Sequence, residues 1–301
     1  MTELFKPLDP SFQFPENRTL TSPSYWSDAW MRLKQNRLAM AGLYMLMGLL
    51  ALAIVGPWIS PYTYYDQQLY LKNTPPCAAF WFGSDELGRD IFTRICWGAR
   101  ISLFVGITAA TLDLIIGVCY GAFAALKGGK TEEFMMRLAD IFHSIPYLLI
   151  VILLMVVMGS GIATIILALT LTKWIDMARI VRGQVLQLKE LDFVKAAVAF
   201  GASQKRILWQ HLIPNAMGPI IVTMTLTIPT AIFAEAFLSF LGLGVQAPIA
   251  SWGTMASDGL SALSYYPWRL FFPAGFITLT ILSFNLLGDG IRDAFDPRLR
   301  K

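Results

Sequence analysis

The chain has 301 residues, of which 55% are hydrophobic and 15% charged, and its mean hydropathy is +0.55. A soluble globular domain cannot bury that much apolar surface, so the composition indicates an integral membrane protein. The net charge of +4 is small and scattered, which suits a membrane surface better than nucleic acid. Three cysteines without a CxxC spacing and two histidines give little support to a disulfide framework or a zinc site, although a Cys77–Cys96 bridge is a minor alternative.

The hydrophobic runs predict an all-α, polytopic membrane protein with six transmembrane helices. A bilayer core needs about 20 mainly apolar residues in helical form. The third and fourth runs are short and are separated only by residues 159–161, so we expect a tight hairpin there. The expected spans are 39–59, 101–126, 147–157 with its flanks, 162–178, 217–241 and 271–287.

The positions of Lys and Arg predict which side of the membrane each segment occupies, because these residues are retained on the cytoplasmic side. With a cytoplasmic N-terminus, the inner segments hold 18 of the 24 basic residues and the outer segments hold five. Both termini are therefore expected in the cytoplasm. Segments 60–96 and 242–268 are then external.

The first 38 residues are expected to form a cytoplasmic N-terminal segment, followed by one transmembrane domain over 39–301. This segment lacks the apolar core of a signal peptide, and its first 24 residues have a composition typical of disorder. Trp26, Trp30 and Leu33 fall at helical spacing beside basic residues, which favours an amphipathic helix at the inner interface. A frayed basic flank is the alternative.

A distinctive inner segment at about 189–214 separates the expected fourth and fifth spans. It predicts a first helix bearing Phe193, a break at Gly201, and a second helix that begins at Ser203 and ends near Pro214. The segment is too polar to enter lipid and too apolar to remain free in water. We therefore expect it to bind a groove on another protein.

The motif within this segment has a regular spacing. Ala196 and Ala197 are followed by Gly201, and Leu212-Ile213-Pro214 lies at the end. The pattern resembles the EAA loop of ATP-binding-cassette (ABC) importer permeases, which runs Glu-Ala-Ala, three residues, Gly, nine residues, Ile-x-Leu-Pro. Lys195 replaces the acidic residue and His211 replaces the isoleucine. The resemblance implies an ATPase-coupling role for Lys195, Ala196, Ala197, Gly201, Ile207 and Pro214.

Further stretches of the chain are similar to one branch of that family. They occupy residues 82–90, 98–103, 235–244, 251–253 and 285–297. In this order they resemble the signatures of the C-type permease of the oligopeptide and dipeptide subfamily. Residues 174–184 and 272–276 are closest to the oligopeptide members.

The resemblance also implies a set of partners. They are a homologous B-type permease subunit, two ABC ATPase subunits, an extracytoplasmic peptide-binding protein, the peptide substrate and the lipid bilayer of a bacterial cytoplasmic (inner) membrane. Nucleic acid is not among them. Residues 128–131 lack the first glycine of a phosphate-binding loop, so ATP and magnesium are expected on the partner ATPases. We expect no catalytic residue, metal or cofactor in this chain.

Ionisable residues inside the expected spans are candidates for a polar interior, because exposing a charge to lipid costs at least ~2.5 kcal/mol. For Glu235 we weigh a structural hydrogen-bonded role equally against a lining of the translocation path, and for Asp113 the structural role is favoured. Lys173, Asp176 and Arg179 are three residues apart and predict a charge ladder at the inner end of one helix.

Other functions remain as alternatives. The same architecture could import nickel chelates or other small solutes. An ion-coupled secondary transporter should show paired broken helices and interior ion ligands, and a membrane-embedded enzyme should show a His, Cys or Ser constellation. The sequence shows neither pattern, and stable co-purification with ATPases would separate these classes.

Overall fold

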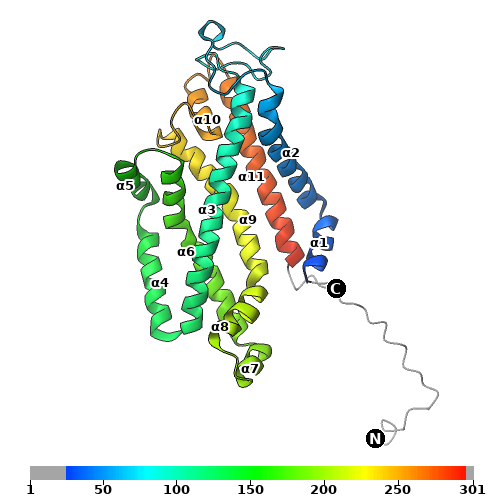
Figure 1. The fold of residues 1–301 in the computed structure, drawn as a ribbon, viewed down its shortest axis with the longest axis vertical. Helices are drawn as coiled ribbons and strands as arrows, with labels where there is room; N and C mark the ends of the chain where they lie inside the picture. Colours follow the sequence, from blue (N-terminus) through cyan, green and yellow to red (C-terminus); the bar gives the residue numbers. More distant parts are fainter. Residues whose placement is uncertain (1–24, 296–301) are drawn as a thin grey trace, which may run out of the picture.

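The computed structural model describes residues 25–295, which form a helical bundle without a β-strand apart from one isolated bridge between Ser84 and Asp90. The disorder expected for residues 1–24 falls outside the described residues. The helices, shown in Figure 1, are α1 (Tyr25–Gln35), α2 (Arg37–Ile59), η1 (Leu69–Leu71), α3 (Ile91–Lys127), α4 (Gly129–Ser144), α5 (Tyr147–Met158), α6 (Ile162–Lys189), α7 (Asp192–Ala199), α8 (Gln204–Ile207), η2 (Leu208–Leu212), α9 (Ile213–Phe240), α10 (Trp252–Leu260) and α11 (Trp268–Phe295).

Four helices of the described chain are long and apolar enough to cross a membrane, and the bent pair α4 and α5 could make a fifth crossing. The four are α2, α3, α11 and a continuous helix from Gln204 to Phe240. These helices agree with an all-α, multi-pass membrane protein. The count of six spans stays a prediction, because α6 carries Lys173, Asp176 and Arg179 in its length.

The stretch between the second and third expected spans is helical. Residues 129–144 form α4, which runs beside α3 and α6 (Figure 1). Polar contacts join it to its neighbours: Arg182 of α6 pairs with Glu132, and the Tyr120 hydroxyl of α3 donates to the Met135 carbonyl at 2.7 Å. A search for continuous hydrophobic runs misses such an amphipathic helix, because its apolar residues alternate with charged ones at helical spacing.

The following helix, α5, has 12 residues and is bent by 79° from α4. At 1.5 Å per residue its length is about 18 Å, well short of a bilayer core of about 30 Å. The bend falls at Pro146, which precedes α5 and has no N–H to continue the helical hydrogen bonds. α5 then packs against α6 after a turn at Gly159, so the expected neighbours do lie together.

Helix α3 begins ten residues earlier than the expected second span. Asp90 caps it by accepting a hydrogen bond from the Thr93 N–H at 2.9 Å. The early turns contain Arg94 and Arg100, whose charges hide this part of the helix from a hydropathy pattern. At 37 residues α3 forms the centre of the bundle and packs on α6 and α9.

Close backbone approach explains two glycines of α3. A Cβ on Gly121 would lie 2.2 Å from the Ala178 carbonyl oxygen of α6, and one on Gly106 would lie 2.6 Å from the Ile232 side chain of α9. Small residues let helices pack closely where lipid supplies no hydrophobic driving force. These contacts fix α6 and α9 on either side of α3.

The N-terminal helix α1 turns its apolar side toward the end of α11. Leu33 is buried with Ala39 and Ala294, whereas Trp30 is exposed. Asn36 separates α1 from α2 by accepting hydrogen bonds from the first N–H groups of α2. The interfacial location of α1 stays a prediction.

The three cysteines are free, so the alternative of a Cys77–Cys96 disulfide is not formed.

Figure 1 shows which segments lie at each end of the bundle. The segment between α2 and α3 and helix α10 lie together at the upper end of the view. Helices α7 and α8 lie at the lower end, beside the turn from α3 to α4. The segments expected on one side of the membrane therefore share one end of the fold, although which end faces the cytoplasm stays a prediction.

Candidate functional site

The loop at the lower end is organised around Gly201. The backbone of Gly201 has φ of +77°, which only glycine adopts without strain, and its N–H donates to the Val198 carbonyl at 2.9 Å. A Cβ added there would meet no atom within 4 Å. Glycine is therefore needed for the turn, and the space above it is open.

Buried side chains fix this loop to the bundle. Val194 of α7 and Ile207 of α8 pack with Val181 and other apolar residues of α3 and α6. Ser203 caps α8 by accepting a hydrogen bond from the Arg206 N–H at 3.3 Å. The loop therefore has a defined shape without any partner.

The opposite side of the same loop exposes apolar side chains. Phe200 is 91% exposed, and no described residue covers its ring. Such an apolar patch in a defined shape marks an interaction surface, because it costs free energy to leave in water. The exposed apolar residues are Leu191, Phe193, Val198, Phe200 and Trp209; of these, Leu191, Val198 and Trp209 had not been singled out by the sequence pattern.

The six residues that the sequence assigns to coupling divide between the buried side of the loop, which packs on the bundle, and its exposed side. Ile207 is buried at 5% exposure, so it supports the loop from within and does not line its surface. Lys195 makes an exposed ion pair with Glu190 at 3.5 Å. Ala197 is half-buried, and the exposed members are Lys195, Ala196, Gly201 and Pro214.

The expected end of the second short helix near Pro214 is wrong. Helix α8 continues through a π-turn at Leu208–Leu212 into α9, giving one helix from Gln204 to Phe240. Pro214 has no N–H, and the π-turn shifts the hydrogen bonding just before it, with the Ile213 N–H donating to the Leu208 carbonyl. The exposed loop is thus directly continuous with a long apolar helix.

Glu235 lies in α9 with no exposed surface. Its carboxylate accepts hydrogen bonds from the Ser239 hydroxyl at 2.9 Å and from the Ser102 hydroxyl of α3 at 3.3 Å. Ser102 in turn accepts the Trp252 N–H of α10. These hydrogen bonds join α3, α9 and α10. They fit the structural hydrogen-bonded role, one of the two roles weighed for Glu235 from the sequence.

Asp113 lies on α3 and is also buried, but both of its carboxylate oxygens lack a hydrogen-bond partner among the described residues. The charge ladder expected on α6 takes a different form. Arg179 pairs with Asp140 of α4 at 2.6 Å, so the pairing runs between helices. Lys173 makes no ion pair with the residues of the described chain.

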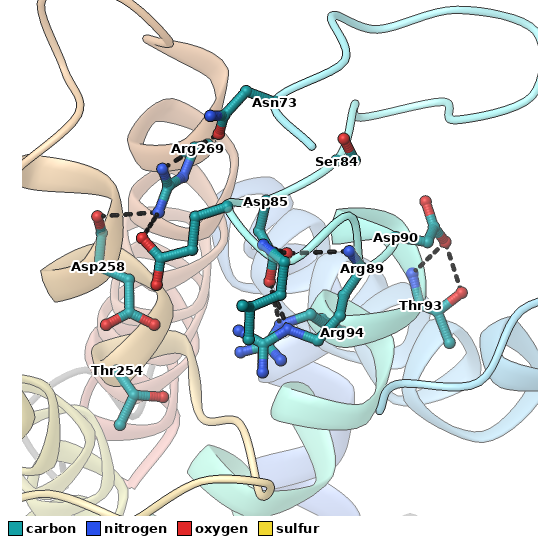
Figure 2. A network of polar contacts seen from close by, with 12 residues as sticks. Asn73, Ser84, Asp85, Arg89, Asp90, Thr93, Arg94, Thr254, Asp258 and Arg269 are labelled. Carbon is teal, nitrogen blue, oxygen red and sulfur yellow. Dashed lines mark hydrogen bonds and ion pairs between the residues drawn. The ribbon is translucent and has the colours of Figure 1, made fainter. Parts of the chain in front are cut away.

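The upper end contains a buried network of charges, shown in Figure 2. Asp85 accepts from the Arg89 Nε at 2.6 Å and lies 3.6 Å from the Arg94 Nε. Arg269 of α11 joins the network by donating to Glu86 at 3.0 Å and to Asn73 at 3.2 Å. Arg89, Arg94 and Arg269 are all under 7% exposed. The network ties the segment before α3 to α11.

A polar cavity of about 250 Å³ lies beside this network, between Arg94 and Asp258 of α10. Burial raises the pKa of the Asp258 carboxyl, against the opposing effect of Arg94. Sequence reasoning assigned no site here. The signals in the sequence were the acidic and basic residues just before the second apolar run and the family resemblance of residues 82–90.

Among residues 25–295, no group of three or more His, Cys, Asp or Glu side chains is placed to hold a metal ion. The prominent features are therefore a long apolar bundle, an exposed apolar loop continuous with one of its helices, and buried charges at the other end. These features define a polytopic membrane domain with an exposed apolar loop, an organisation that fits a transport permease.

Comparison with known proteins shows the family. Residues 117–301 match the profile described as "Binding-protein-dependent transport system inner membrane component", and residues 24–76 match "N-terminal TM domain of oligopeptide transport permease C". The chain belongs to this family of transport permeases. The expected resemblance is thereby confirmed.

Relatives match over nearly the whole chain. The chain is 57% identical to the oligopeptide transport system permease protein OppC of Bacillus subtilis, over 99% of this chain and 98% of the relative. It is 60% identical to the dipeptide transport system permease protein DppC of the same organism, over 93% and 88%. With OppC of Escherichia coli the identity is 42%, over 95% and 96%.

The fold is also found among solved structures. A chain of the MetNI methionine ABC transporter in an inward facing conformation matches with a TM-score of 0.55 and 19% identity. The match covers 66% of this chain and 94% of that chain. At this identity the likeness shows the fold alone.

Proposed function

We propose that this chain is one of two transmembrane permease subunits of an ABC importer that moves oligopeptides or dipeptides across the bacterial cytoplasmic membrane. Its relatives are named as permeases of oligopeptide and dipeptide transport systems. A homologous B-type permease completes the path, two ATPase subunits bind ATP and magnesium, and an extracytoplasmic protein delivers the peptide. Both termini lie in the cytoplasm.

The observation that carries the proposal is the exposed apolar surface of α7 and its turn at Gly201. Phe200 is 91% exposed although Val194, on the same helix, is buried. An ATPase groove that takes up this surface would remove the apolar side chains from water. The open space above Gly201 lets another backbone approach closely.

The continuity of α8 with α9 suggests how ATP could drive transport. A displacement of the docked loop passes into α9 without a flexible linker, because Gln204–Phe240 is one helix. Closure of the two ATPases would then move α9 relative to α3 and favour the outward-open or the inward-open state of the pair. The chain itself performs no covalent chemistry in this mechanism.

The test is reconstitution with its partners. A tagged chain is purified with the partner permease and both ATPases, placed in proteoliposomes, and supplied with binding protein, ATP and a labelled peptide. We expect the ATPases to co-purify and the peptide to accumulate only with ATP. Uptake that follows an ion gradient without ATP, or a chain that retains no ATPase, would reject the proposal.

A further inference from the structure

An open groove with a volume of about 560 Å³ runs along α9, between α5, α6 and α11. Its walls are mainly apolar, with Phe233 of α9 and Ile281 of α11 among them. Three exposed polar residues also line it, each from a different helix: Lys173 of α6, Thr230 of α9 and Asn285 of α11. The groove therefore combines apolar walls with a single charge.

These polar residues fall within the membrane spans expected from the sequence, 162–178, 217–241 and 271–287. Lys173 is eleven residues beyond the start of α6 at Ile162, about 16 Å along the helix axis. Asn285 is 17 residues, or about 26 Å, from the start of α11 at Trp268. Both are far from the ends of their helices, where a long side chain can reach the interface.

A charged side chain at this depth costs about 2.5–3.5 kcal/mol if it faces hydrocarbon. Lys173 is exposed, and no hydrogen bond or ion pair within 4.0 Å holds its ammonium among the described residues. The exposed side of α2 offers the contrast, because it presents apolar residues such as Met47 and Ile54. We therefore expect water or another protein against the groove, whereas the exposed side of α2 is suited to contact with lipid.

The nearest counter-charges lie behind the groove. Asp113 of α3 is buried and interacts electrostatically with Lys173, and Asp176 lies one turn further along α6. Neither carboxylate is within 4.0 Å of the Lys173 ammonium in the described structure. The ammonium is therefore balanced at a distance, while its three N–H donors remain available to a ligand.

We propose that this groove is part of the translocation path and that Lys173 binds the terminal carboxylate of the transported peptide. The inference rests on the proposed function. Peptides differ in their side chains, but an unmodified linear peptide always ends in a carboxylate. Apolar walls accept varied side chains, and one ammonium selects the common charged end. Lysine suits a passing ligand, because its compact charge on a flexible stem imposes no bidentate geometry.

The experiment uses the complete importer in proteoliposomes. Uptake is measured for one peptide with a free C-terminal carboxylate and for the same peptide with a C-terminal amide. The variants are Lys173→Gln and Lys173→Arg, and Lys130→Gln is a control that removes an exposed lysine of α4, outside the groove. The binding protein is the same throughout, so its own preference cancels in the variant to wild-type ratio.

We expect Lys173→Gln to lower uptake of the free-acid peptide by about tenfold and to leave uptake of the amide within about twofold. Lys173→Arg should retain most of the discrimination, and Lys130→Gln should leave it unchanged. Equal loss for both peptides would overturn the proposal and indicate that Lys173 pairs with an acidic residue of the partner permease. Unchanged uptake of both would overturn it too. If the wild type imports neither peptide, the proposed function itself fails.

Discussion

The two ends of the bundle treat polar and apolar side chains in opposite ways. At the upper end, three arginines and Asp85 are buried and paired within the chain. At the lower end, Phe200 and Trp209 are exposed on a loop whose backbone is well defined. The upper end pairs its buried charges within the chain, although the Arg94 Nη1 has no hydrogen-bond partner among the described residues, whereas the lower end leaves an apolar surface exposed.

This difference separates stability from assembly. Removing one partner from a buried ion pair leaves an unpaired charge, which destabilises the folded chain itself. Changing an exposed apolar surface has little effect on the folded chain, but it alters binding. Substitutions at the two ends should therefore fail in different assays.

The largest effect is expected at the upper end, from Asp85→Ala. The change leaves Arg89 and Arg94 buried without their common acceptor, which should lower the free energy of unfolding by about 3–5 kcal/mol. Thermal unfolding of the purified protein in detergent measures this loss. Asp66→Ala is the matched control, because Asp66 is an exposed acid in the same segment. Equal stability of the two variants would show that the network does not hold this end together.

At the lower end, Gly201→Arg should abolish ATPase retention and peptide uptake while the amount of membrane-embedded protein stays normal. The side chain adds bulk and charge at the docking surface and should weaken docking by about 2–5 kcal/mol.

Gly242→Arg is the matched control for that change. Gly242 has φ of +79° and equally open space, but it lies beyond the C-terminal end of α9, at the opposite end of the bundle. Co-purification and uptake are compared for both variants. Retained ATPases and full uptake in Gly201→Arg would reject the docking role, and loss of ATPases in both variants would show that backbone strain alone is responsible.

A smaller effect is expected from Glu235, which lies near the C-terminal end of α9. Glu235→Leu leaves the Ser102 and Ser239 hydroxyls without their acceptor and should cost about 1–3 kcal/mol of stability. Glu235→Gln keeps an acceptor oxygen and should remain close to wild type in thermal unfolding and uptake. Identical behaviour of the two variants would mean that these hydrogen bonds contribute nothing measurable.

The smallest effect is expected from Lys195→Glu on the lower loop. It removes an exposed ion pair with Glu190, and such surface pairs contribute about 0–1 kcal/mol. The change also restores the acidic residue of the EAA pattern. Uptake within a few fold of wild type is expected, whereas complete loss would indicate a partner surface adapted to a positive charge at this position.

Several parts of the fold were accessible from the sequence alone. The long apolar runs determine α2 and the central parts of α3, α9 and α11, because the helix is the only way for one chain segment to satisfy its backbone in lipid. Gly201 could be located as a break from its residue type, since a positive φ is strained for any other residue. The resemblance to the EAA pattern extended the prediction from Gly201 to the whole loop at about 189–214.

Other features were decided only by tertiary structure. Helix α4 is held against the bundle by polar contacts from Tyr120 of α3 and from Arg179 and Arg182 of α6. Ile207 is buried because the bundle continues beneath the loop. Asp90 caps the start of α3, and Asp85 from the preceding segment neutralises Arg94 in its first turn. A hydropathy pattern records the free energy of single residues in lipid. It does not contain the neighbours that pair a charge, cover a helix face or leave Lys173 open in a groove.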